Sequence, residues 1–411
     1  MIAEFRRFAI AALASLLGLV AQTATMYGES KYDPGASDAQ IKIGNIVPYS
    51  GPASTFSVIG KTEAAFFQMI NDQGGINGRK INFISYDDGY SPPKTVEQAR
   101  RLVESDEVLL LFSVLGTAPN SAIQKYVNSR KIPNLFVASG AEKWSDPKNF
   151  PWTMGWQPSY QIEGRIYAKY LLENYPNAKI GVLFQNDDSG KDYLIGLREG
   201  LGDKAKSSIV AEVGYEISSP TVESQLQQIK AYGPDVLIDV SAPKFTAQVI
   251  RRLVELNWKP LHIVVGNSRS LGGVIKPAGI ENSQGIISAV YTKDALDPQW
   301  KSDPAMVEWN AFMDKYFPDG DRGDASIVAA YGRSKTLVQV LKQCGDNLTR
   351  ENVMKQAANL DIDVGVLLPG IRVKTSPSNF SPIQQFRMVR FMGEKWEAFG
   401  ELLSADLSAA K

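Results

Sequence analysis

Residues 108–122, VLLLFSVLGTAPNSA, have the pattern of a buried strand that turns directly into a helix. The apolar run is typical of a strand covered on both faces of a parallel sheet. Gly116 and Thr117 then lead into a helix, with Pro119 expected at the first helical position. In a doubly wound α/β sheet, ligands bind at such strand ends because free backbone N–H groups and the positive end of the helix dipole point into the crevice.

A second strand end of the same kind follows at residues 132–140, IPNLFVASG. Adjacent strand ends would bring together the hydroxyl groups of Thr117 and Ser139 with the amides of Ala118 and Gly140. This combination predicts a cradle for one small anionic or polar ligand. The alternative is that Thr117 and Ser139 are ordinary helix caps.

Strands and helices alternate through most of the remaining chain, which predicts an α/β protein with parallel sheets. Further strands are expected at 41–48, 81–84, 180–184, 209–213, 236–238 and 285–290, helices at 303–317 and 326–342, and a hairpin from 385–389 and 396–399. An aromatic, proline-rich break at 150–158 interrupts the alternation and predicts a crossing between two domains rather than one barrel.

The N-terminus has the pattern of a secretory signal peptide over residues 1–24. Arg6 and Arg7 precede an apolar segment at 8–20 that is shorter than the roughly 20 residues of a spanning helix. The single cysteine, Cys344, excludes an internal disulfide and lies far from the region where a lipid would be attached. We therefore expect a diffusible periplasmic protein.

The composition excludes several classes of function. The 44 basic and 44 acidic residues cancel, which argues against a nucleic-acid partner. One histidine, His262, and one cysteine leave little for a catalytic triad, and there is no phosphate-loop or dinucleotide motif. Asp87 and Asp88 end a strand without a histidine nearby, so a helix cap is favoured over a metal pair. We expect no enzyme activity, no cofactor and no metal.

Several spaced motifs resemble those of the periplasmic substrate-binding proteins of the branched-chain amino-acid type, the receptors of ATP-driven importers. The matching stretches are IKIGNIVPYSGP at 41–52, NDQGGINGRK at 71–80, residues 85–88, LGTAPN at 115–120, NDDSG at 186–190 and residues 234–236. The resemblance extends from about residue 39 to the C-terminus.

The resemblance implies a type I periplasmic binding fold, in which two Rossmann-like lobes joined by three hinge crossings close on a ligand. Lobe I is expected at 40–158 plus 289–361, and lobe II at 159–288 plus 362–405. The expected partners are a small carboxylate ligand and the membrane subunits of an ABC permease, and the protein is expected to be a monomer. A sensory or amide-binding module of the same fold is the alternative.

In the family, small residues after the third and fourth strands bind the ligand carboxylate, and an aromatic residue after the Ser-Gly-Pro turn packs on the ligand. Closure then adds contacts from the second lobe. Carried over to this chain and combined with the strand-end analysis, the expected ligand contacts are Phe56, Gly116, Thr117, Ala118, Ala138, Ser139, Gly140, Trp156, Tyr160, Ser189, Phe245 and Asn267.

The chain departs from the family's amino-acid binders at the residue that holds the ligand ammonium. Those proteins place a glutamate in the loop after the strand found here at 262–265, whereas this chain reads Gly-Asn-Ser-Arg at 266–269, with no acidic residue between Glu255 and Glu281. Because an unpaired buried ammonium is unfavourable, we expect a carboxylic acid without an α-amino group. Ser189 stands where relatives often have tyrosine, which enlarges the cleft.

Aromatic residues at or near the expected cleft loops favour an aromatic acid as the ligand. They are Phe56, Trp144, Trp156, Tyr160 and Phe245. Asp187 and Asp188 are the alternative partners for a ligand ammonium. A branched-chain amino acid therefore remains the other candidate ligand.

Overall fold

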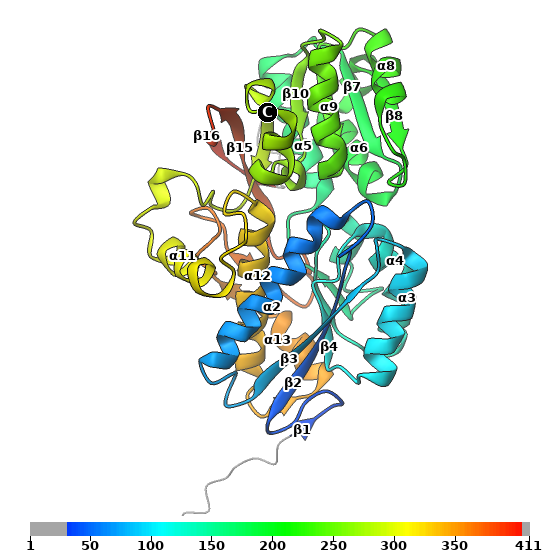
Figure 1. The fold of residues 1–411 in the computed structure, drawn as a ribbon. Coiled ribbons are helices and arrows are strands. Elements are labelled where there is room, and N and C mark those ends of the chain that lie inside the picture. The colour runs from blue at the N-terminus through cyan, green and yellow to red at the C-terminus, as the bar shows by residue number, and fades with distance from the viewer. Residues whose placement is uncertain (1–30, 405–411) are drawn as a thin grey trace, which may run out of the picture.

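A computed structural model describes residues 31–404, so the predicted signal peptide lies outside the described residues. Two sheets form the cores of two lobes (Figure 1). The first lobe contains a five-stranded parallel sheet in the order β3-β2-β4-β5-β6. Its strands are β2 (Gln40–Val47), β3 (Lys80–Asp87), β4 (Leu110–Phe112), β5 (Asn134–Val137) and β6 (Thr153–Gly155).

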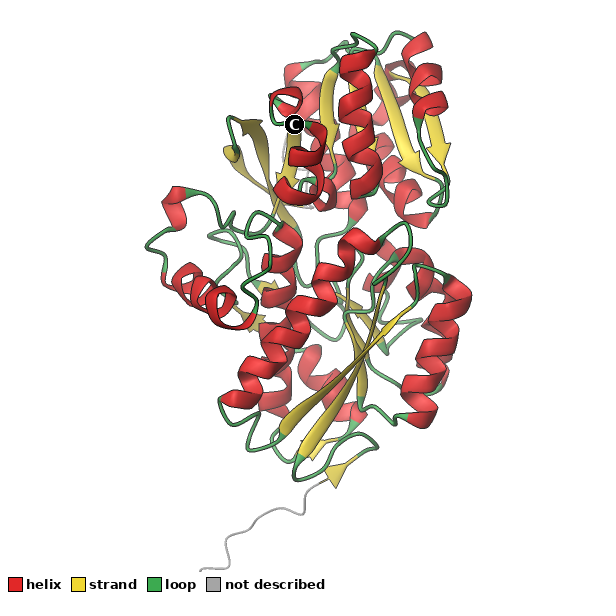
Figure 2. Ribbon diagram, in the orientation of Figure 1, coloured by secondary structure: helices red, strands yellow, loops and turns green. Residues whose placement is uncertain are grey.

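Helices cover both faces of this sheet (Figure 2). Neighbouring residues of β4 point to opposite sides, so Phe112 packs with α2 and α12, and Leu111 packs with α3 and α4. The helices of this lobe are α2 (Ser57–Asp72), α3 (Pro92–Arg100), α4 (Thr117–Ser129), α11 (Pro304–Tyr316), α12 (Ala325–Cys344) and α13 (Arg350–Ala357). Two short strand pairs, β1 (Lys31–Tyr32) with β12 (Asn347–Leu348) and β13 (Asp361–Ile362) with β14 (Val373–Lys374), lie outside the main sheets.

The second lobe contains a seven-stranded sheet in the order β16-β15-β11-β10-β9-β7-β8. Five strands are parallel: β7 (Ile180–Gln185), β8 (Ile209–Tyr215), β9 (Val236–Val240), β10 (Leu261–Val264) and β11 (Ile287–Val290). The hairpin of β15 (Gln385–Met392) and β16 (Lys395–Ser404) adds antiparallel strands at one edge, as predicted. The helices of the second lobe are α5 (Tyr160–Asn174), α6 (Asp188–Leu201), α7 (Ala205–Ser208), α8 (Glu223–Ala231), α9 (Pro243–Glu255) and α10 (Lys276–Ala278).

The chain crosses between the lobes three times: between β6 and α5, between β11 and α11, and between β14 and β15. The first crossing follows the predicted aromatic break, and Trp156 within it is fully buried. The two-lobed α/β fold with three crossings is therefore confirmed. Across residues 31–404 no helix combines the length and the apolar character needed to span a bilayer.

One local prediction at the first strand end is wrong. Helix α4 begins at Thr117, so Pro119 is its third residue and not its first. Gly116 is the N-cap, with a φ of 98° that glycine adopts easily, and this lets the chain enter the helix two residues early.

Candidate functional site

A cleft of about 1140 Å³, measured out to its opening, lies between the carboxyl ends of the parallel strands of the two sheets. Loops after β4 and β5 contribute Gly116, Thr117 and Ala138 from the first lobe. Loops after β9 and β10 contribute Ser241 and Gly266 from the second. This is the position at which open α/β sheets bind ligands.

Seven of the twelve expected contact residues lie on the wall of this cleft: Phe56, Gly116, Thr117, Ala138, Tyr160, Ser189 and Asn267. Five do not: Ala118, Ser139, Gly140, Trp156 and Phe245. The structure thus gathers residues from distant parts of the sequence into one cleft, while their role as ligand contacts stays a prediction.

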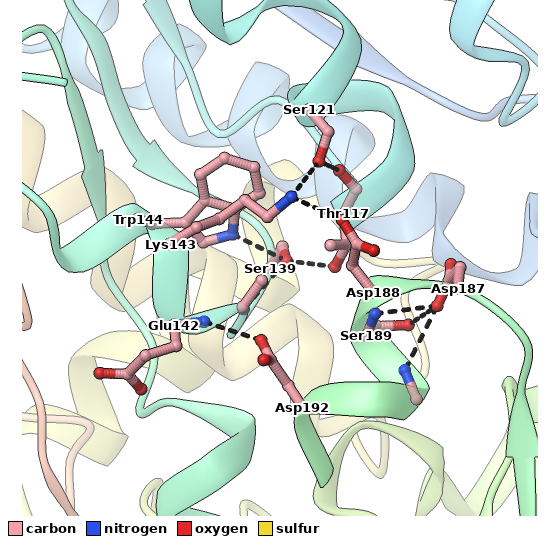
Figure 3. A network of polar contacts seen from close by, with 12 residues as sticks. Thr117, Ser121, Ser139, Glu142, Lys143, Trp144, Asp187, Asp188, Ser189 and Asp192 are labelled. Atoms are coloured by element: carbon pink, nitrogen blue, oxygen red, sulfur yellow. Dashed lines mark hydrogen bonds and ion pairs between the residues drawn. The ribbon is translucent and has the colours of Figure 1, made fainter. Parts of the chain in front are cut away.

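Ser139 lies directly behind Thr117, and the two hydroxyl groups form one hydrogen bond (Figure 3). Its Oγ accepts hydrogen bonds from the Trp144 indole N–H at 2.9 Å and the Ala141 amide at 3.3 Å. Because these two donors occupy its lone pairs, we infer that the Ser139 hydroxyl is the donor in the 2.7 Å hydrogen bond with Thr117 Oγ1. The Thr117 hydroxyl is then left to donate into the cleft.

Two glycines make room for tyrosines beside Thr117. A Cβ at Gly116 would lie 2.5 Å from the Tyr90 ring, and a Cβ at Gly140 would lie 2.7 Å from the Tyr160 ring. Tyr90 and Tyr160 both line the cleft. Gly140 therefore shapes the wall without lining it.

Aromatic rings form much of the wall between the lobes. The Tyr160 ring stacks on Tyr193 at 4.6 Å, and the Tyr291 ring lies edge-on to Phe386 at 5.8 Å. All four line the cleft together with Phe56 and Tyr90. These surfaces suit a flat or extended apolar group.

Trp156 and Phe245 are buried behind the wall because other groups hold them there. The Trp156 indole N–H donates to Thr336 Oγ1 at 2.9 Å. Phe245 lies on the apolar face of α9 and packs against Tyr215 at 4.5 Å. Both therefore serve the core of their lobe.

Glu163 lines the cleft and was missed from the sequence. One of its carboxylate oxygens accepts from the Tyr167 hydroxyl at 2.5 Å and the Gly266 amide at 2.7 Å, and the other accepts from the Tyr193 hydroxyl at 2.9 Å. Burial raises the pKa of Glu163, and these hydrogen bonds oppose the rise. The loop after β10 has no acidic residue of its own, but Glu163 of α5 brings a carboxylate to it.

No distinct sequence signal points to this role of Glu163. Glu163 lies in the first turn of α5 behind the N-cap Ser159, where an acidic residue is ordinarily explained by the helix dipole.

Two buried arginines also line the cleft. Arg333 donates to Ser113 Oγ at 2.8 Å and lies 3.5 Å from the carboxylate of Glu63. Burial raises the pKa of Glu63 to about 8, although the charge of Arg333 opposes this rise. The second arginine, Arg269, follows β10 and has a single weak side-chain hydrogen bond, to Thr292 Oγ1 at 3.5 Å.

The acidic pair that could have served a ligand ammonium is engaged elsewhere. Asp187 caps α6, accepting from the Ser189 amide at 2.9 Å and from its hydroxyl at 2.5 Å. Asp188 pairs with Lys143 of the first lobe at 2.6 Å. Neither lines the cleft.

The cleft offers hydrogen-bond donors, positive charge and apolar surface, which together suit binding of a small anion. His262 lies outside the cleft wall, 3.4 Å from Asp239. Among residues 31–404 no group of three or more histidine, cysteine and acidic side chains is arranged to hold a metal ion.

Comparisons with known proteins agree with this architecture. A family model described as periplasmic binding protein matches residues 40–395. Leu/Ile/Val-binding protein homolog 8 from Brucella abortus (strain 2308) is 21% identical over 376 residues, covering 88% of this chain and 89% of the relative.

Two solved structures share the fold. A branched chain amino acid ABC transporter from Thermus thermophilus with bound valine superposes with a TM-score of 0.81 at 15% identity, covering 90% of this chain and 98% of the other. A fatty acid ABC transporter substrate-binding protein from Thermomonospora curvata has a TM-score of 0.76 at 18% identity, covering 93% and 97%. The resemblance inferred from the motifs is confirmed, and with it a solute-binding family of the type I fold. The chain belongs to the periplasmic binding protein family.

Proposed function

We propose that this protein is an extracytoplasmic receptor of an ABC importer that captures a small carboxylate and closes its two lobes around it. The family membership and the cleft between the lobes support this proposal. The predicted signal peptide agrees with export to the periplasm.

The observation that carries the carboxylate proposal is the position of Thr117 on the cleft wall, at the first turn of α4. It lies where the α4 dipole is positive, and Gly116 keeps side-chain bulk away from the same point. A ligand carboxylate there would accept hydrogen bonds from Thr117 and from backbone amides of the helix start. Ser139 would act as a positioning residue for Thr117.

The aromatic wall extends the proposal to the body of the ligand. Tyr160, Tyr193 and Phe56 form surfaces on which a ring or an aliphatic chain packs. Two contacts join the lobes and would help to hold a closed state: Lys143 pairs with Asp188 at 2.6 Å, and the Glu142 amide donates to Asp192 at 2.9 Å (Figure 3). Ligand binding would shift the population toward this form, which the permease would recognise.

Glu163 supports a second candidate ligand, a branched-chain amino acid. Its carboxylate borders the cleft and would accept a hydrogen bond from a ligand ammonium. Three protein donors already engage it, however, and the nearby charge of Arg269 opposes the rise in its pKa that burial causes. We therefore favour acids without an α-amino group.

Isothermal titration calorimetry with benzoate, hexanoate, leucine and valine separates the two candidates. We expect heat from the simple acids and little from the amino acids. Tight binding of leucine or valine with no binding of the simple acids would contradict the preference. Glu163→Gln should then abolish amino-acid binding, whereas it should leave the binding of a simple acid within a few-fold of the original.

A further inference from the structure

We propose that Arg269 is a second anion-binding residue, on the opposite side of the cleft from Thr117, and that the ligand carries an acidic group at each end, as a dicarboxylic acid does. The proposal rests on the proposed function, because it assumes that the cleft receives a small carboxylate. It adds a second anchor and a narrower class of ligand.

The guanidinium of Arg269 is buried but unpaired. The residue is 5% exposed, and its one side-chain hydrogen bond is the 3.5 Å contact with Thr292. Within residues 31–404 no carboxylate lies within 4.0 Å of it. A guanidinium has five N–H donors in a planar fork, so most of the donors of Arg269 have no protein acceptor.

Arg333, the other buried arginine on the cleft wall, has protein partners that are consistent with a structural role. It is 1% exposed, donates to Ser113 and lies beside Glu63, and its guanidinium is 5.3 Å from the Trp156 ring. Arg269 has no such set of partners. A buried arginine cannot neutralise itself by losing a proton, so an unpaired one is most readily explained by an anion that arrives from outside.

The acidic groups near Arg269 do not serve as its ion-pair partner. The charges of Asp294 and Asp324 favour its protonated form and oppose the lowering of the Arg269 pKa by burial, yet neither forms an ion pair with it. Asp324 caps α12 by accepting from the Ser326 amide at 2.8 Å, and Glu163 accepts from three protein donors. Burial raises the pKa of both Asp324 and Glu163.

The two proposed anion-binding residues, Thr117 and Arg269, lie on different lobes of a cleft that aromatic rings also line. Thr117 follows β4 of the first sheet, and Arg269 follows β10 of the second. Tyr160, Tyr193 and Tyr291 line the same cleft. A carboxylate forms a bidentate pair with the arginine fork, so a ligand acidic at both ends and apolar in the middle fits all three features.

The test compares each dicarboxylate with a partner that has one acid replaced by an amide of the same size. The probes are terephthalate against 4-carbamoylbenzoate, and adipate against its monoamide, titrated calorimetrically into the purified protein. We expect the dicarboxylate of at least one pair to bind roughly ten- to a hundredfold more tightly, as a charge-assisted bidentate pair implies. Arg269→Gln should remove that preference.

Two variants serve as controls. Arg251→Gln removes an exposed positive charge from α9 of the same lobe and should leave the preference unchanged. Arg269→Lys keeps the charge without the fork and should give an intermediate preference. Thermal unfolding of each variant checks that it is folded.

The outcomes distinguish the role of Arg269 from the proposed function as a carboxylate receptor. Equal binding of acid and amide in both pairs, or a preference that persists in Arg269→Gln, would overturn the role of Arg269 and leave the carboxylate receptor intact. Failure of all four compounds, and of simple monocarboxylates, would overturn both.

Discussion

The direction of the Ser139 hydrogen bonds leads to a prediction that separates affinity from stability. In Ser139→Ala the indole N–H of Trp144 and the amide of Ala141 lose their buried acceptor. An unsatisfied buried donor costs about 1–3 kcal/mol, and the 3.3 Å bond is the weaker of the two. We expect the free energy of unfolding to fall by about 2 kcal/mol.

The effect of Ser139→Ala on ligand affinity should pass entirely through Thr117. Thr117→Ala removes the donor itself and should weaken binding by about 1 kcal/mol or more, roughly fivefold. Because Ser139 lies behind Thr117 and does not line the cleft, the double variant should bind the ligand as weakly as Thr117→Ala alone. Thr117→Ser keeps the hydroxyl and serves as the matched control.

Calorimetry with a benzoate-type acid and urea unfolding of the original protein and the four variants measure both quantities. A further loss of affinity when Ser139→Ala is added to Thr117→Ala would mean that Ser139 contacts the ligand directly. Unchanged affinity in the double variant would remove this end of the cleft from the ligand site.

Three further predictions concern charged groups around the cleft. Since the pKa of Glu63 is about 8 when folded and near 4.5 in the unfolded chain, the unfolding free energy should be highest below pH 4.5 as far as Glu63 contributes, and should fall as pH rises toward 8. Glu63→Gln should flatten that fall in unfolding curves from pH 5 to 8, and an unaltered slope would contradict the assignment. The pair of Lys143 and Asp188 joins the lobes but is partly exposed, so Lys143→Ala should weaken ligand binding by at most about 1 kcal/mol and only at low salt. Calorimetry at two salt concentrations checks this, and an equal loss at high salt would speak against an electrostatic contact. Arg269→Gln should raise the unfolding free energy of the ligand-free protein by about 1 kcal/mol or more, and with it the melting temperature, because it removes an unpaired buried charge; a lower melting temperature would argue that the charge is compensated.

The elements that form sheets and the edges of the cleft were predictable from the sequence because their patterns are local. The apolar runs at β4 and β7 and the glycine turn between β15 and β16 predicted the strands found there. The helix α13, with the polar sequence RENVMKQA, has too few apolar residues to be predicted by periodicity. Its stability comes from packing against α12.

The cleft was predictable only in part, because its charged residues come from elements that meet through the fold. The strand ends at Thr117 and Ala138 were identified from a family motif and a strand pattern. Glu163 is far in sequence from Gly266, and only the packing of α5 brings its carboxylate to the loop after β10. Phe245 has the spacing of a core residue, and the structure places it in the core.

A thermal-shift screen of the purified protein tests whether it is a receptor for carboxylates. The compounds are aromatic and aliphatic acids, dicarboxylic acids, amino acids and amides. A ligand at 100 times its dissociation constant should stabilise the fold by about 2.7 kcal/mol, which corresponds to a shift of a few degrees. We expect shifts only with carboxylates, with acids lacking an α-amino group among the strongest. Shifts produced only by neutral amides, or by no carboxylate at all, would contradict this expectation.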